Sequence, residues 1–136
     1  METLLIADDE KNIRDGLKCI LDWEELGFTL CGEAANGEEA LSSILKNNPS
    51  LVLLDIRMPK LSGIDIIRIA REQGYSGRFI ILSGYSDFAY AQAAIRYGVE
   101  YYLTKPIDED ELLDAINTIR EAIEQERRKS DNIALY

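Results

Sequence analysis

Three aspartates, a serine and a lysine in this sequence are residue types that can bind a metal ion and transfer a phosphoryl group. Each follows a short, mostly apolar run: Asp8-Asp9 follow TLLIA, Asp55 follows LVLL, Ser83 follows RFIIL, and Lys105 comes shortly after EYYL. Clustered carboxylates raise one another's pKa unless a cation lies between them. Mg²⁺ prefers such oxygen ligands, and a carboxylate can serve as a phosphoryl-accepting nucleophile.

Each of these residues has an ordinary structural explanation when it is taken alone. An aspartate after a strand is most often a helix cap or a turn residue, and Ser83 alone would be a turn residue. Lys105 alone would be a solvated surface charge. Only their convergence at one edge of a sheet favours a role in metal binding and phosphoryl transfer. A metal ion held by Asp8, Asp9 and Asp55 would leave an Asp55 oxygen able to attack phosphorus, while Lys105 and Ser83 would bind the phosphoryl oxygens.

The segments that must position these residues alternate between strand-like and helix-like patterns. Short apolar runs predict strands buried on both faces, at 3–7, 29–34, 51–54, 78–82 and 100–103. Apolar residues spaced three or four apart predict helices at 12–21, from about 37 to 46, and at 64–71, 86–97 and 108–129, with Asn36 as a cap of the second. The pattern predicts an α/β fold with a doubly wound parallel sheet of five strands, for which we expect the common flavodoxin-like order 2-1-3-4-5. Such sheets bind ligands beyond the carboxyl ends of their strands, where these side chains are expected.

Composition narrows the classes of function. The 136 residues fit one domain, and the net charge of −10 disfavours direct binding to nucleic acid or anionic lipid. The two cysteines, Cys19 and Cys31, are not in a metal-ligand spacing and histidine is absent, so a zinc site is not expected. Both cysteines are predicted to be buried and reduced. The chain opens without a signal-peptide pattern and has no apolar run approaching about 18 residues, so we expect a cytoplasmic protein with no membrane association.

Over roughly residues 2–124, the sequence resembles the receiver domains of bacterial response regulators. The resemblance rests on Asp8-Asp9, on LLDIRMPKLSG around Asp55, on ILSGYSD with Ser83, and on YYLTKP with Lys105. The stretches DWEELGF and GYSDFAYAQAAIRYGVEYYLTKPI resemble the subgroup whose output is an AraC-type helix-turn-helix domain. That output domain is not among these residues. The resemblance makes 1–124 the receiver domain and 125–136 a C-terminal helix extension or the start of a linker.

The resemblance implies a role for each site residue. Asp55 corresponds to the phosphoacceptor, and Asp8 and Asp9 correspond to the pair that binds Mg²⁺. The backbone carbonyl of Arg57 corresponds to the third protein ligand of that ion.

Three further positions correspond to the switch and to phosphate binding. Ser83 matches the hydroxyl that turns toward the phosphoryl group, and Tyr102, rather than Tyr101, matches the aromatic switch residue. Lys105 matches the lysine that pairs with the phosphoryl group, and the Lys105-Pro106 bond is one that is usually cis in the family.

The function implied is a phosphorylation-dependent switch rather than an enzyme. A sensor histidine kinase would phosphorylate Asp55, and the chain would assist its own phosphotransfer and dephosphorylation. The face formed by the fourth helix, fifth strand and last helix would change, and it could also pair two copies in a homodimer. DNA would be bound through the output domain alone. The bulky Arg57 and Tyr85, two positions after Asp55 and Ser83, predict slow self-dephosphorylation.

Three alternatives are weighed against this function. A stand-alone or degenerate receiver would act only as a docking module, although all of the expected acids, the hydroxyl and the lysine are present. A Mg²⁺-dependent aspartyl-phosphate hydrolase would carry its nucleophile after the first strand, in a different order of motifs. A flavodoxin-like cofactor carrier would need a phosphate-binding loop rich in Gly, Ser and Thr where Asp8-Asp9-Glu10 stand.

Overall fold

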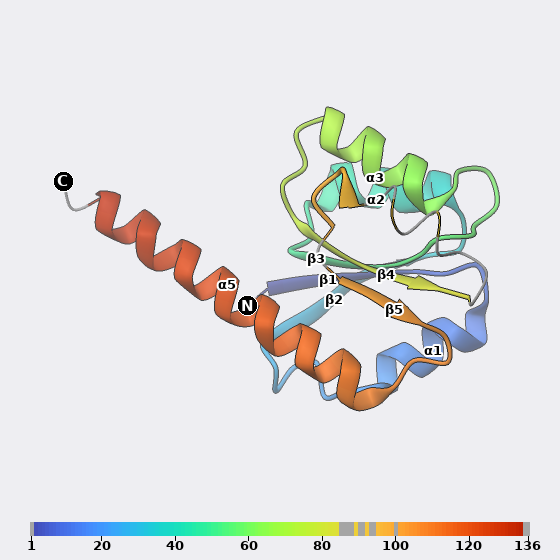
Figure 1. Cartoon of the computed structure of the whole chain (residues 1–136), viewed down its shortest axis with the longest axis horizontal. Coiled ribbons are helices and arrows are strands. Elements are labelled where there is room, and N and C mark those ends of the chain that lie inside the picture. The colour runs from blue at the N-terminus through green and yellow to red at the C-terminus, as the bar shows by residue number, and fades with distance from the viewer. Residues whose placement is uncertain (1, 85–88, 90–91, 93–94, 100, 135–136) are drawn as a thin grey trace.

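Strands and helices alternate along the chain in the computed structural model, which describes residues 2–84, 89, 92, 95–99 and 101–134 (Figure 1). The strands are β1 (Glu2–Ala7), β2 (Phe28–Ala34), β3 (Leu51–Asp55), β4 (Arg78–Ser83) and β5 (Tyr101–Thr104). The helices are α1 (Lys11–Ile20), α2 (Gly37–Asn47), α3 (Gly63–Glu72) and α5 (Glu109–Ala134). The helix expected at 86–97 and the first residue of the strand expected at 100–103 lie largely outside the described residues, and so does Tyr85.

The five strands form one sheet in the order β2-β1-β3-β4-β5, and every neighbouring pair is parallel. This confirms the predicted fold class and strand order. The chain moves outward from β1 to β2 and then crosses to β3 on the other side of β1, so the order reverses between β1 and β3. In register, Ala7 lies opposite Leu54 and Asp55 lies opposite Leu82. The residues that follow β1 and end β3 are therefore neighbours at the reversal point, where such folds bind ligands.

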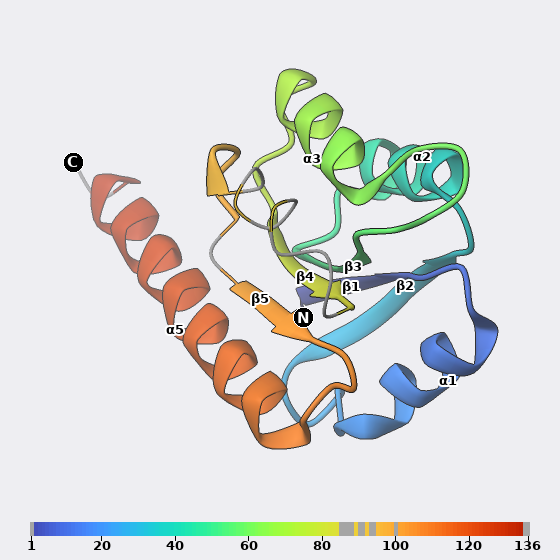
Figure 2. The same cartoon turned by 45° about the vertical axis from the view of Figure 1, so that its right-hand side comes forward.

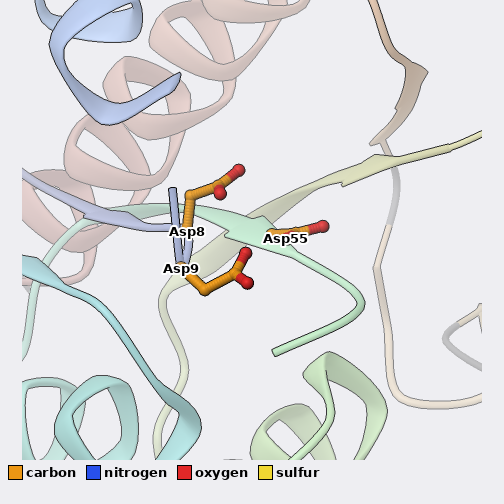
Figure 3. A group of neighbouring side chains, drawn as sticks. All are labelled: Asp8, Asp9 and Asp55. Carbon is orange, nitrogen blue, oxygen red and sulfur yellow. The ribbon is translucent and has the colours of Figure 1, made fainter. Parts of the chain in front are cut away.

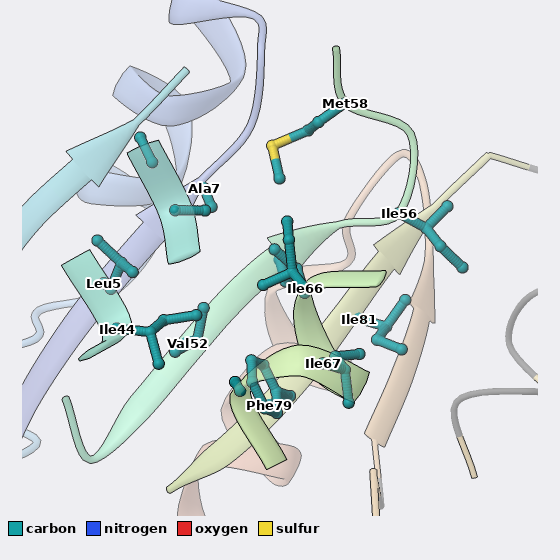
Figure 4. Packing of buried hydrophobic residues seen from close by; sticks show 14 of the residues in the cluster. Leu5, Ala7, Ile44, Val52, Ile56, Met58, Ile66, Ile67, Phe79 and Ile81 are labelled. Carbon is teal, nitrogen blue, oxygen red and sulfur yellow. The ribbon is translucent and has the colours of Figure 1, made fainter. Parts of the chain in front are cut away.

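Helices cover both faces of the sheet, which explains why its three central strands, β1, β3 and β4, are apolar and buried at most positions (Figures 1 and 2). On one face, Val52 and Phe79 pack with Ile66 and Ile67 of α3 and with α2 (Figure 4). The opposite face packs against α1 and α5, and its buried residues include Leu4, Ile6, Leu53, Ile80, Leu17, Leu112, Ile116 and Ile119. Burying a side chain of this size contributes about 1.5–3 kcal/mol, so the two clusters hold the strand ends in place.

The predicted boundaries of strands and shorter helices agree with the structure to within one or two residues. Asn36 caps α2 as expected, because its side chain accepts the Glu39 N–H at 3.0 Å. The prediction for Cys19 was wrong: it is exposed, since α1 turns Leu17 rather than Cys19 into the core, while Cys31 is half-buried. Both cysteines are free.

The last helix is longer than predicted. It ends at Ala134 rather than Lys129, so the basic residues at 127–129 lie inside the helix and its last turn has none. Two ion pairs fasten this part of α5 to the starts of strands: Arg78 to Glu126 at 2.5 Å, and Arg127 to Glu2. Beyond them, the helix projects away from the sheet. Among the described residues, no helix combines the length and the hydropathy needed to cross a membrane.

Candidate functional site

Three carboxylates meet where β1 and β3 end. One oxygen from each of Asp8, Asp9 and Asp55 lies within 4.8 Å of the others. Asp8 is fully buried and Asp55 nearly so, whereas Asp9 is exposed. Figure 3 shows the three side chains pointing to the same side of the strand ends. The strand order alone predicts this grouping, because the carboxyl ends of neighbouring parallel strands share one edge.

Lys105, which follows β5, reaches across this edge to two of the acids. Its Nζ donates to Asp8 Oδ2 at 2.9 Å and lies 3.4 Å from Asp55 Oδ1. Burial disfavours the charged amine, but the hydrogen bond to Asp8 and the negative charge of Asp55 together raise the Lys105 pKa. The peptide bond between Lys105 and Pro106 is cis, as the sequence predicted.

The Asp55 carboxyl is held in an unfavourable environment for a negative charge. Burial, followed by repulsion from Asp8, raises its pKa to about 6, although Lys105 and the Arg57 N–H act in the opposite direction. A single lysine therefore does not compensate for three acids. The donor set is all oxygen and carries excess negative charge, which fits a hard divalent cation such as Mg²⁺.

The loop after β3 forms the outer wall of the site. Asp9 and the segment 56–59, with Ser62, line a surface hollow of about 500 Å³. The exposed Arg57 lies in this loop, and its backbone N–H is 3.4 Å from Asp55 Oδ1.

Two glycines let other segments approach that loop closely. Gly37 at the start of α2 donates its N–H to Pro59 O at 3.0 Å, and a Cβ at Gly37 would lie 2.3 Å from Leu61 O. Gly63 at the start of α3 donates to Ile56 O at 2.8 Å, and a Cβ there would lie 2.8 Å from Ile56 Cα. The starts of α2 and α3 therefore set the position of the chain that follows Asp55.

Ser83 and Tyr102 are joined by a hydrogen bond. Ser83 ends β4, is fully buried, and donates its hydroxyl to Tyr102 Oη at 2.5 Å. Tyr102 packs on the face covered by α2 and α3, whereas Tyr101 packs on the opposite face. The two residues expected to form the switch are thus in contact, and Tyr101 is directed away from them.

One contact at the site was not anticipated from the sequence. Arg14 of α1 donates from Nη1 to the backbone carbonyl of Asp8 at 2.8 Å and from Nε to Glu33 at 3.1 Å. A sequence signal exists, since Arg14 stands between the inward-facing Ile13 and Leu17 of an amphipathic helix. A charged residue at that position needs partners on neighbouring elements.

Comparison with known proteins agrees with this geometry. The family model for the response regulator receiver domain matches residues 4–117. The chain belongs to this family. Among solved structures, the receiver domain of AraT, a response regulator from Geobacillus stearothermophilus, superposes with a TM-score of 0.88 at 38% identity, covering 93% of this chain and 98% of that one. A two-component transcriptional regulator AraC from Clostridium phytofermentans gives a TM-score of 0.84 at 35% identity, covering 93% and 98% of the two chains.

The receiver domain also has longer curated relatives. The uncharacterized transcriptional regulatory protein YesN of Bacillus subtilis is 40% identical over 119 residues, which is 88% of this chain and 32% of that protein. The transcriptional regulatory protein HptR of Staphylococcus aureus is 38% identical over 135 residues, 98% of this chain and 53% of that protein. The chain therefore spans between a third and about half of these relatives. Membership in a family of regulators disfavours the aspartyl-phosphate hydrolase as an alternative.

Proposed function

We propose that this receiver domain accepts a phosphoryl group on Asp55, with Mg²⁺ bound by Asp8, Asp9, Asp55 and the carbonyl of Arg57, and that it acts as a phosphorylation-dependent switch. The observation that carries this proposal is the group of three carboxylates within 4.8 Å, two of them buried, beside one lysine. Keeping such an arrangement ionised costs free energy, as the raised Asp55 pKa indicates, so a stability role alone does not explain it.

The residues divide the chemistry among them. An Asp55 oxygen attacks phosphorus and forms a new P–O bond, while the bond between phosphorus and the donor's imidazole nitrogen or acyl oxygen breaks with its electron pair going to the donor. Lys105 Nζ, already 3.4 Å from Asp55, can balance charge on the transferred oxygens, and Ser83 can donate a hydrogen bond to one of them. Bound Mg²⁺ neutralises charge on the carboxylates and on the transferred oxygens.

The switch follows from a competition for one proton. The Ser83 hydroxyl has a single hydrogen, which it donates to Tyr102. A phosphoryl group on Asp55 offers strong acceptor oxygens, and when Ser83 donates its hydrogen to one of them, that hydrogen no longer bonds to Tyr102 Oη. Tyr102 must then either donate its own hydroxyl hydrogen to Ser83 Oγ or move away, and either change alters the contacts around β5. This is a local change in charge that biases a two-state element.

The partners follow from the same function. The donor is proposed to be a sensor histidine kinase in the cytoplasm, and the face that includes β5 and α5 is proposed to be read out, including by pairing of two copies. Residues 1–124 are assigned to the receiver and 125–136 to an extension toward an output domain. Transcriptional regulators among the relatives support a DNA-binding output domain of AraC type. The net charge of −10 supports assigning DNA contacts to that domain alone.

Intact mass after incubation with acetyl phosphate tests the phosphoacceptor directly. With Mg²⁺, the chain is expected to gain one phosphoryl group, which EDTA prevents and Asp55→Asn abolishes. Glu121→Gln, on the exposed face of α5, is the matched control and should be phosphorylated normally. An adduct that survives Asp55→Asn would refute the assignment, and so would failure to form any adduct with a donor that phosphorylates another receiver domain in parallel.

The lifetime of the adduct tests the self-dephosphorylation that the chain is proposed to assist only weakly. Arg57 is an exposed, bulky side chain beside the site, and it has no carboxylate or amide to position an attacking water. A phosphoryl group that persists for many minutes after removal of the donor is expected. Loss within seconds would contradict this part of the proposal.

A further inference from the structure

Asp8 has a protein partner on each of its polar groups. Its N–H donates to Ala34 O at 3.0 Å. Its carboxylate accepts from Lys105 Nζ at 2.9 Å and from the Glu10 N–H at 2.9 Å. Its backbone carbonyl accepts from Arg14 Nη1 at 2.8 Å. Among these contacts, only the one from Arg14 acts on the peptide group that links Asp8 to Asp9.

That peptide group controls where Asp9 points. A peptide unit is planar, so the direction of the Asp8 carbonyl fixes the position of the Asp9 Cα relative to Asp8. Asp9 is exposed, and its carboxylate lies beside that of Asp55. Rotation about the Asp8 Cα–C bond moves this carbonyl and the Asp9 Cα together, so it would shift the Asp9 carboxylate relative to the other two acids.

The Arg14 guanidinium is itself held in place. Its Nε donates to Glu33 Oε1 at 3.1 Å, and its side chain is only 13% exposed. Glu33 also accepts from Lys18 at 2.9 Å. A guanidinium can serve two acceptors in fixed directions, whereas a lysine amine is a point charge on a flexible stem. Arg14 therefore connects the end of β1 rigidly to Glu33 of β2.

We propose that Arg14 is a positioning residue for the acidic pair: by holding the Asp8–Asp9 peptide, with Glu33 as its anchor, it keeps both carboxylates in the arrangement that binds a divalent cation. This inference rests on the proposed function, because it assumes that the pair binds Mg²⁺. It goes beyond that function by assigning part of the Mg²⁺ affinity to a residue that does not touch the ion.

Whether Arg14→Gln weakens or strengthens Mg²⁺ binding distinguishes a positioning role of Arg14 from a purely electrostatic one. Removing a nearby positive charge reduces repulsion of Mg²⁺, so a purely electrostatic role predicts tighter binding in Arg14→Gln. Loss of positioning predicts weaker binding. Removal of groups that orient metal ligands typically lowers metal affinity 10–100-fold, so we expect Mg²⁺ to bind Arg14→Gln about tenfold more weakly.

The experiment is a Mg²⁺ titration of the whole chain followed by backbone amide NMR shifts, which gives affinity without relying on phosphorylation. Lys18→Gln is the matched control, since Lys18 is also a cation of α1 bonded to Glu33 but does not contact Asp8. It should bind Mg²⁺ as the unaltered chain does, or slightly more tightly. Arg14→Lys, which keeps the charge and loses the two-pronged geometry, should recover only part of the lost affinity.

Several results would overturn this proposal. Affinity equal to or tighter than that of the unaltered chain in a folded Arg14→Gln would do so, and so would full affinity in Arg14→Lys or an equal loss in Lys18→Gln. If Arg14→Gln does not fold, Glu33→Ala decides, with severalfold weaker binding supporting the proposal and unchanged binding overturning it. Failure of the unaltered chain to bind Mg²⁺ would refute the proposed function as well, whereas unchanged affinity in Arg14→Gln refutes only the role of Arg14.

Discussion

Replacing Asp55 by asparagine should stabilise the metal-free domain at neutral pH. The Asp55 carboxyl has a pKa of about 6 in the folded protein, against an ordinary value of 3.8. Ionising it therefore costs the folded state free energy that the unfolded chain does not lose. Asparagine has nearly the same shape and carries no charge, so the variant avoids this cost.

The magnitude follows from the pKa difference. About two pKa units at about 1.4 kcal/mol each give a cost of about 3 kcal/mol when Asp55 is fully ionised. The size of this cost depends on pH, while its direction does not. Well below the ordinary pKa of 3.8, at about pH 3, the carboxyl is mostly protonated in both states and the cost is nearly absent. It grows as the pH rises through the interval between 3.8 and about 6, and it is complete above that interval.

Urea unfolding of the unaltered chain and of Asp55→Asn, each in EDTA and at several pH values, measures this difference. Asp55→Asn should gain about 3 kcal/mol of unfolding free energy at pH 7.5, and the gain should shrink toward zero as the pH falls to about 3. Glu121→Gln is the control and should show no such trend. If the unfolding free energies of Asp55→Asn and the unaltered chain differ by the same amount over the whole pH range, the reasoning is refuted. Saturating Mg²⁺ should reduce the difference in unfolding free energy between Asp55→Asn and the unaltered chain, because the ion stabilises the chain whose carboxylate cluster is intact.

Three further predictions concern phosphoryl transfer and stability. Lys105→Gln removes the amine beside Asp8 and Asp55, so the rate of phosphorylation by acetyl phosphate should fall about a hundredfold while the protein stays folded. Intact mass measures this rate, and an unchanged rate would exclude a role for the amine. Ile66→Ala leaves a cavity under α3 and should lower the unfolding free energy in urea by about 2–5 kcal/mol, with a loss below about 1 kcal/mol contradicting the packing described. Asn36→Ala removes the cap of α2 and should cost about 1 kcal/mol in the same assay, whereas Asn36→Ser should retain most of it.

The sequence predicted the fold and the grouping of the candidate site residues for a physical reason. Parallel strands that alternate with helices leave their carboxyl ends at one edge, so any residue directly after a strand is placed by strand order alone. Asp8, Asp55, Ser83 and Lys105 could be brought together in this way without knowledge of a single contact. The cap at Asn36 was predictable too, because it depends on residues only three apart.

Other features depend on how the helices pack against the sheet, which the spacing of apolar residues in the sequence does not reveal. The contact between Arg14 and the Asp8 carbonyl requires the rotation of α1 against β1 and β2, which is set by packing. The exposure of Cys19 depends on the same rotation. The end of α5 was predicted too early, at about residue 129, because nothing in the sequence pattern shows what Arg127 contacts. In the structure Arg127 pairs with Glu2, and the helix continues to Ala134.

The ion pairs that hold α5 lie at the edge of the sheet opposite to the carboxylate cluster. The acids lie at the carboxyl ends of the strands, whereas Glu126 and Arg127 bind residues at the strand starts. A strand of five or six residues separates these edges by about 17–20 Å. Anything joined beyond Ala134 is thus held away from the chemistry, so a fluorescent label or a fused domain attached there should leave access of a phosphodonor to Asp55 unobstructed.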